Sequence, residues 1–216
     1  MNFLCHAVPY LDDDPVVAAL TGLPDLLSVV DRRVRVRRKM AVPFAQAEGV
    51  VGEVARGVML HIDDDRWFHQ TAAFVELNMH LAVMLREHLP GDRGFRPSFL
   101  GHVLIEVILD AMWLNDDPDL GRRYYDAVAA IDGPAVASAV GELTGKPVPG
   151  LPDVIERFGR EKFLLDYGDD IRLHRRMSGV MRRVGLEPLP DRLIVAYPEI
   201  RRRVAHQRAD LLNRSA

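Results

Sequence analysis

The run of residues 99–113 constrains the fold more than any other part of the sequence. It is apolar except for three ionisable side chains, those of His102, Glu106 and Asp110. A helix that is apolar on nearly every other face is normally buried on all sides. Positions four apart advance by about 40° around a helix, so the three side chains form one stripe about 80° wide. The run therefore predicts a buried helix that carries ionisable groups into the interior.

Two carboxylates in such a helix need a cation nearby. Removing an unpaired carboxylate from water costs on the order of several kcal/mol, even after the surroundings relax. Glu106 and Asp110 would therefore face either a metal ion or an arginine from another helix. In the first case His102 is a further metal ligand, and in the second it is a hydrogen-bonded core histidine. Both interpretations stay open on the residues alone.

The rest of the chain repeats the helical pattern. Apolar residues recur at spacings of three and four, and strand-like alternation is scarce outside residues 34–37. Turn-forming residues at 90–91, 145–152 and 188–190 separate the segments. We expect one all-α domain over residues 1–216, a helical bundle. Its helices are predicted at residues 15–20, 23–39, 43–61, 66–89, 98–115, 120–130, 134–143, 152–166, 170–184 and 198–213.

Composition narrows the classes of function. With 48% hydrophobic residues in 216, the chain can bury a core. Its net charge of -3 argues against a surface built throughout for nucleic acid or anionic membrane. The single cysteine, Cys5, permits no intrachain disulfide, and no run of about 18 uncharged apolar residues occurs. We expect a cytoplasmic protein that binds neither membrane nor nucleic acid, and its oligomeric state stays open.

A second group of ionisable residues lies at residues 61–69. His61 ends an apolar run, aspartates follow at positions 63 to 65, and His69 comes shortly after. Imidazole and carboxylate donors together suit manganese, iron or zinc. We expect one helix to end near His61 and the next to begin near Arg66, where the aspartates would instead complement a helix dipole. We favour His61 as a ligand or catalytic group and expect four histidines to be solvated, His80, His88, His174 and His206.

Four motifs follow one another along the chain. It opens Met-Asn-Phe-Leu-Cys-His-Ala, and Gly22 is followed by Asp25. Residues 57–65 read Gly-Val-Met-Leu-His-Ile-Asp-Asp-Asp, and residues 106–111 read Glu-Val-Ile-Leu-Asp-Ala. Taken together, these motifs resemble the acyl carrier protein phosphodiesterase family, relatives of the HD-type metal-dependent phosphohydrolases. The resemblance extends over nearly the whole chain.

That resemblance implies an HD-domain-like helical fold and a phosphodiesterase that releases 4'-phosphopantetheine from holo acyl carrier protein. It also implies a divalent metal, manganese first with iron or zinc as alternatives. Glu106 or His69 would act as the general base. The ligands would come from five residues, with His102 as a sixth outside the family pattern: His6, Asp25, His61, Asp65 and Asp110.

The same resemblance requires groups that bind phosphate. Guanidinium binds phosphate through paired hydrogen bonds, and we single out Arg35, Arg38 and Arg175 for this role. The substrate would be acyl carrier protein or a small phosphodiester. Basic residues 32–39 would attract an acidic carrier protein, or they would simply form a solvated face.

Three positions depart from the family pattern. Ile62 stands where the motif has arginine, His69 where it has aspartate, and Ala111 where it has histidine. These departures keep open an alternative function, that of a helical binding protein which has lost hydrolysis or been re-tuned. The additional imidazoles of His69 and His102 also keep open a two-iron site for oxygen chemistry. Residues 32–39 have no aromatic platform beside them, which argues against nucleic-acid binding there.

Overall fold

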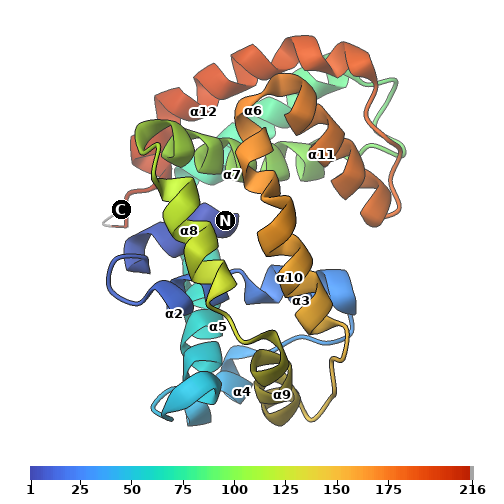
Figure 1. The fold of residues 1–216 in the computed structure, drawn as a ribbon. Helices are drawn as coiled ribbons and strands as arrows, with labels where there is room; N and C mark the ends of the chain where they lie inside the picture. Colours follow the sequence, from blue (N-terminus) through green and yellow to red (C-terminus); the bar gives the residue numbers. More distant parts are fainter. Residues whose placement is uncertain (215–216) are drawn as a thin grey trace. The chain divides into compact units, whose positions relative to one another are not determined.

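Helices alone build the fold in the part of the chain that the computed structural model describes, residues 1–214 (Figure 1). The prediction of an all-α protein is confirmed. The 3-10 helices are η1 (Val8–Tyr10), η2 (Val42–Phe44), η3 (Phe163–Gly168) and η4 (Asp191–Ala196). The α-helices are α1 (Phe3–Ala7), α2 (Pro15–Leu20), α3 (Leu23–Val30), α4 (Arg38–Ala41), α5 (Gly49–Phe68), α6 (Ala72–His88), α7 (Pro97–Asp116), α8 (Leu120–Ala129), α9 (Gly133–Thr144), α10 (Leu151–Glu161), α11 (Asp170–Arg183) and α12 (Tyr197–Leu211).

The chain divides into two compact units. Unit 1 comprises Met1–Arg66 and Asp119–Phe163. Unit 2 comprises Trp67–Pro118 and the described residues from Leu164 onward. Each core is therefore assembled from two separate stretches of sequence. That both units belong to one domain, as we expected from chain length, stays a prediction.

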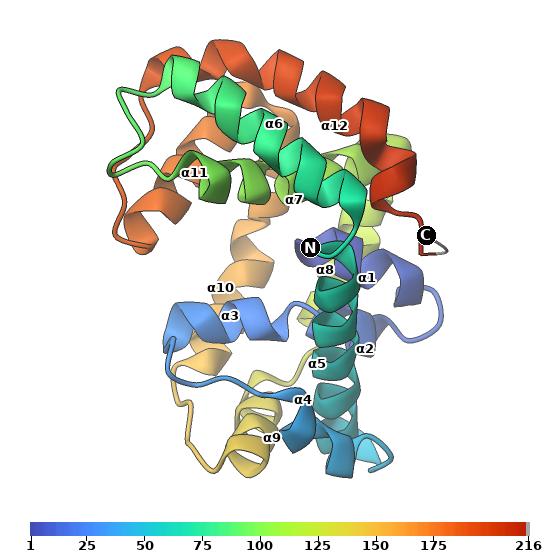
Figure 2. The ribbon, with the colours of Figure 1, turned by 180° about the vertical axis from the view of Figure 1, so that it is seen from behind.

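Aromatic side chains fill the core of unit 1 where α1, α8 and α10 meet. Phe3 on α1 lies against Phe158 on α10, with ring centroids 4.7 Å apart. Tyr125 on α8 packs on the same Phe158 ring at 5.7 Å. Each such pair adds about 0.5–1.5 kcal/mol beyond the area it buries. Because α10 also packs beside α3 (Figure 2), these contacts anchor α1, and with it His6, inside unit 1.

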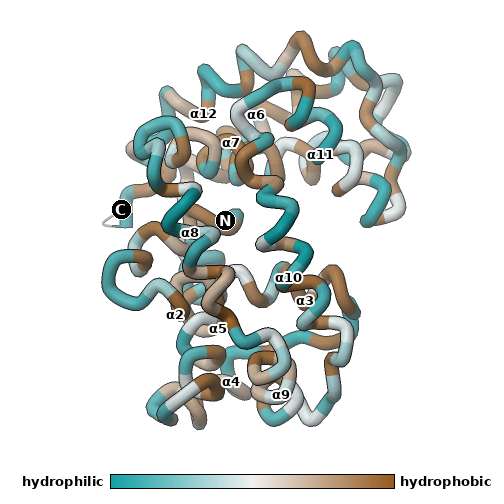
Figure 3. The backbone as a smooth tube through the Cα atoms, in the orientation of Figure 1, coloured by the Kyte–Doolittle hydropathy of each residue, from teal (hydrophilic) through white to brown (hydrophobic). Residues whose placement is uncertain are grey.

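In unit 2, α7 packs against α6 and α12, as the apolar run predicted. Leu104, Ile105 and Ile108 of α7 are all buried. Along the helices of the chain, hydrophobic and hydrophilic residues alternate (Figure 3), as expected where one face is covered. Within residues 1–214, α7 is the one helix long and apolar enough to cross a membrane. Buried core helices meet the same criterion, and 61% of its qualifying window is buried.

The predicted helix boundary at His61 is wrong. Helix α5 continues to Phe68, so His61 and the three aspartates that follow lie inside it. No proline or glycine occurs between Gly57 and Phe68 to end the helix earlier. Aspartate within a helix costs no more than about 0.7 kcal/mol relative to alanine, which is too little to break it. The next helix, α6, begins after Thr71, whose hydroxyl accepts a hydrogen bond from the Phe74 amide.

The helix predicted over residues 23–39 is shorter than expected. Helix α3 ends at Val30, and residues 31–37 are not helical. Within this segment Val34 and Val36 are buried, whereas Arg35 between them is exposed. Burying alternate residues requires the period of two of an extended chain, which a helix cannot provide. The basic segment is therefore extended.

Close contact between α5 and α2 depends on Gly57, one turn before His61. A Cβ atom at Gly57 would lie 2.8 Å from the Leu20 Cβ and 2.9 Å from the Leu20 carbonyl carbon. We therefore expect Gly57→Ala to lower the free energy of unfolding by about 1–3 kcal/mol, because backbone must move. Urea unfolding measures this change.

Gly179→Ala on α11 is the matched control. No atom lies within 4 Å of a Cβ built at Gly179, and its backbone angles are ordinary. Alanine there should raise the free energy of unfolding by about 0.5–1 kcal/mol through its higher helix propensity. Stabilisation by both substitutions would contradict the close contact between α5 and α2.

Candidate metal centres

Three donors from α1 and α5 meet inside unit 1. His61 and Asp65 lie one turn apart on α5 and therefore share a face, whereas His6 comes from α1. His6 Nε2 lies 3.3 Å from Asp65 Oδ1, and His61 Nε2 lies 3.5 Å from Asp65 Oδ2. The donor atoms offered by the three residues all lie within 4.8 Å of one another. We call His6, His61 and Asp65 cluster 1.

The imidazoles of cluster 1 are closed to solvent. His6 and His61 are buried, and their ring centroids lie 4.2 Å apart. Nδ1 of His6 lies 3.5 Å from Asp64 Oδ2. Burial, aided by the adjacent charge of His6, lowers the pKa of His61 to about 4. At neutral pH His61 is therefore uncharged and keeps a lone pair that a metal ion can use.

Neighbouring groups hold the Asp65 carboxylate in its ionised form. Burial alone would raise its pKa, but a hydrogen bond from His6 and nearby positive charges hold the pKa well below its usual range. One of these charges is the amino group of Met1, which pairs with Asp65. Although burial would lower it, the pKa of His6 is raised by Asp64 and Asp65. The partly exposed Asp65 carboxylate is therefore ionised and lies beside positive charge.

A second group of donors lies in unit 2. His69 directly follows α5, while His102 and Glu106 lie one turn apart on α7. Glu106 Oε1 lies 2.8 Å from His69 Nε2 and 3.0 Å from His102 Nε2. The two imidazole rings lie 4.6 Å apart between centroids. We call His69, His102 and Glu106 cluster 2.

Cluster 2 is more open to solvent than the imidazoles of cluster 1. The exposed fraction is 28% for the His69 side chain, 35% for His102 and 12% for Glu106. Although burial would raise it, positive charge and hydrogen bonds from His102 and His69 hold the pKa of Glu106 well below its usual value. An ionised Glu106 is thus available as an acceptor or ligand. That Glu106 or His69 serves as a general base stays a prediction.

Two predicted ligands are members of neither cluster. Asp110 is fully buried on α7, one turn beyond Glu106. Asp25 is half-buried in the first turn of α3. Of the other predicted ligands, His6, His61 and Asp65 come together in unit 1, and His102 lies with the two predicted bases in unit 2. Ligation of one ion by residues of both units stays a prediction.

The three arginines predicted to bind phosphate are exposed. Arg35 lies in the extended segment of unit 1, and Arg175 lies on α11 of unit 2. Arg38 donates from Nε to Asp63 Oδ1 at 2.9 Å. Asp63 lies about 160° around α5 from Asp65, so this ion pair occupies another face of the helix. Both partners of this ion pair are exposed and water screens their attraction, so an anion can replace Asp63 at little cost.

Two histidines are more deeply placed than their sequence context indicated. Every residue of α1 is buried, so the apolar neighbours of His6 were the signal that its ring lies in the core. His174 was predicted to be solvated, and that prediction is wrong. Its ring is buried, with Nδ1 3.1 Å from the Tyr197 hydroxyl. The reason is that Leu173 and Met177 bury this face of α11.

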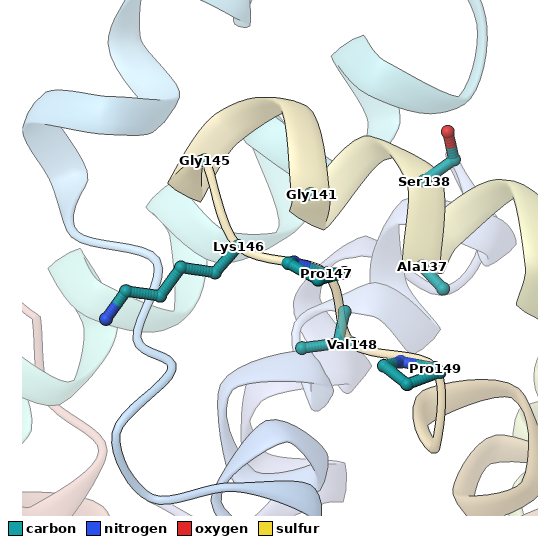
Figure 4. Close-up of a pocket in the computed structure, with 8 residues that line it drawn as sticks. All are labelled: Ala137, Ser138, Gly141, Gly145, Lys146, Pro147, Val148 and Pro149. Carbon is teal, nitrogen blue, oxygen red and sulfur yellow. The ribbon is translucent and has the colours of Figure 1, made fainter.

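An open pocket in unit 1, at the end of α9, includes neither cluster. Its volume is about 530 Å³. Figure 4 shows the Lys146 side chain extending from the loop that follows α9. The lining contains no carboxylate or imidazole and offers no metal-binding chemistry. It consists of Ala137, Ser138, Gly141, Gly145, Lys146, Pro147, Val148 and Pro149.

The lowered pKa of His61 predicts an acid sensitivity of the metal-free protein. In the unfolded chain this histidine takes up a proton near pH 6.5, whereas in the folded protein it does so only near pH 4. Between these values the unfolded state binds more protons, so the free energy of unfolding falls as the pH falls. His61 should contribute roughly 2–3 kcal/mol to this loss.

Urea unfolding from pH 7 to pH 4 tests this expectation. His61→Gln should flatten the pH dependence relative to the unaltered protein. His80→Gln, which changes an exposed histidine on α6, should leave it unchanged. Equal slopes in all three proteins would contradict the assignment.

Comparison with known proteins does not assign the chain to a family. No family model, curated protein or solved structure matches the chain.

Proposed function

We propose that this protein is a metal-dependent phosphodiester hydrolase whose metal lies at cluster 1. One observation carries the proposal, the meeting of two buried imidazoles with an ionised carboxylate inside unit 1. Buried charges and unpaired ring nitrogens are costly unless a partner satisfies them. Nδ1 of His6 has the Asp64 carboxylate as a partner at 3.5 Å, whereas Nε2 of His6 and Nε2 of His61 both face Asp65. A divalent cation would balance the charge of Asp65 and use imidazole lone pairs.

The donor set fits the proposed ion. Two nitrogens and one carboxylate suit manganese, iron or zinc, with manganese our first choice. Adjacent donors about 2.1 Å from a tetrahedral ion lie about 3.4 Å apart. The distances from His6 Nε2 and His61 Nε2 to the Asp65 carboxylate, 3.3 and 3.5 Å, agree with that spacing. Asp25 and Asp110 are further candidate ligands.

Such an ion would lower the pKa of a bound water and neutralise charge on a phosphoryl group. The chain's own residues would supply the rest. His61 stays uncharged at neutral pH because burial lowers its pKa, and Asp65 stays ionised. Glu106 is the proposed general base, with His69 as the alternative. Arg35, Arg38 and Arg175 are the proposed phosphate-binding residues.

The more specific proposals, on fold type, substrate and location, rest on the sequence motifs. The opening residues 1–7 and the segment 57–65 resemble the acyl carrier protein phosphodiesterase family. On that basis we propose an HD-domain-like arrangement, holo acyl carrier protein or a small phosphodiester as substrate, and a cytoplasmic location. The exposed basic segment before α4 would favour an acidic partner.

An alternative is a helical binding protein without hydrolytic activity. The contacts that favour it are those that satisfy the carboxylates without a metal. Asp65 pairs with the Met1 amino group, and Glu106 accepts from two imidazoles. Tight, stoichiometric binding of manganese, iron or zinc to protein purified without chelator would separate hydrolase from binding protein.

The proposal predicts manganese-dependent turnover of bis-p-nitrophenyl phosphate. His61→Ala should lower kcat/KM by at least about 100-fold, because loss of an outer-sphere partner of a metal already costs up to that much. His80→Ala is the matched control and should retain full activity, since His80 is exposed on α6. Turnover that persists in chelated protein, or in His61→Ala, would contradict the proposal.

Asp110→Ala tests whether the buried aspartate of α7 belongs to the same machinery. We expect turnover to be abolished. Asp110→Asn keeps the volume of the side chain and removes its charge, so it separates a loss of packing from a loss of a charged ligand. Undiminished turnover in both variants would remove Asp110 from the proposed site.

A further inference from the structure

Cluster 2 has the composition and spacing of a metal site in its own right. We propose that His69, His102 and Glu106 bind a second divalent transition-metal ion, of the zinc or iron class, within unit 2. All three donors belong to unit 2, so the site needs no residue from cluster 1. The site shares Glu106 and His69 with the proposed hydrolysis, but ion binding there does not require that activity and would stand if the activity were absent.

The spacing of the donors matches a coordination sphere. Donors about 2.1 Å from an ion lie about 3.0 Å apart at a right angle and about 3.4 Å apart at the tetrahedral angle. Glu106 Oε1 lies 2.8 Å from His69 Nε2 and 3.0 Å from His102 Nε2. Both values are close to the right-angle spacing, and the donor atoms of all three residues lie within 4.8 Å of one another.

The donor types select the class of ion. Two imidazoles and one carboxylate suit zinc, iron and their first-row neighbours, whereas magnesium and calcium prefer oxygen donors alone. Three protein ligands leave at least one coordination position for water or a small anion. The partial exposure of His69 and His102 gives that position access to solvent.

The surroundings hold the three donors in place. His102 and Glu106 lie one turn apart on α7, the spacing at which two side chains of a helix meet. Phe74 on α6 packs edge-on against the His69 ring at 4.9 Å and against the His102 ring at 5.0 Å. Both imidazoles are therefore oriented before any ion arrives, which lowers the entropic cost of binding.

The competing interpretation is a hydrogen-bonded group without a metal. Both imidazoles would then donate from Nε2 to Glu106, and the triad would only fasten α7 to the segment after α5. Cobalt distinguishes the two, because it replaces zinc and absorbs visible light once bound to nitrogen and oxygen donors. Titration of the full, chelator-treated chain should reach two equivalents of cobalt, one for each cluster.

Single-residue variants show which cluster binds each equivalent of cobalt. His102→Ala should lose one equivalent and retain the other, and His61→Ala should lose the complementary one. His80→Ala, on the exposed surface of α6, should still bind both. Unchanged stoichiometry in His102→Ala would overturn the proposal, whatever the effect of His61→Ala on hydrolysis.

A measurement on the unaltered chain guards against variants that fail to fold. Diethylpyrocarbonate modifies accessible imidazoles, and mass spectrometry locates the modified residues. Stoichiometric zinc should protect His69 and His102 by at least about 10-fold in rate, since coordination occupies the reactive nitrogen. His80 should react equally with and without zinc. Absence of protection at both His69 and His102 would overturn the proposal.

Discussion

A carboxylate packed between helices must be met by donors or cations, and this requirement applies both to Asp65, which stays partly exposed, and to Glu106. Asp65 is met by two imidazoles and the Met1 amino group, and Glu106 by two imidazoles. In each case at least one partner comes from a distant stretch of the unit, so the carboxylate ties segments together as well as holding charge. In unit 1 these contacts add to the aromatic packing that anchors α1, and in unit 2 they hold the segment after α5 against α7.

The two clusters use the same kinds of donor in different surroundings. The imidazoles of cluster 1 are buried, and burial suppresses the protonation of His61. Cluster 2 leaves its imidazoles partly in water and buries mainly the carboxylate. A closed group holds an ion tightly and exchanges it slowly, whereas an open one admits exogenous ligands. Similar residues can thus support two kinds of metal chemistry in one chain.

Local periodicity accounts for what the sequence predicted correctly. The helix carrying His102 and Glu106 and its burial follow from spacing and hydropathy within one run. The sequence places His61 beside aspartates but wrongly predicts that its helix ends there. Acidic residues often begin a helix, whereas here they continue one. Contacts between residues far apart in the sequence could not be predicted in this way. Nothing local joins His6 to Asp65 or His69 to Glu106, since these contacts depend on how separate segments pack.

The alternation at residues 34–36 has a consequence for how this protein can vary. Val34 and Val36 are buried, and exposed arginines flank them. Exchange of one basic residue for another leaves that arrangement intact. Insertion or deletion of one residue between Asp31 and Val34 would reverse it and turn arginines toward the core, at a cost of several kcal/mol. The fold therefore constrains the length of this link more strongly than its composition.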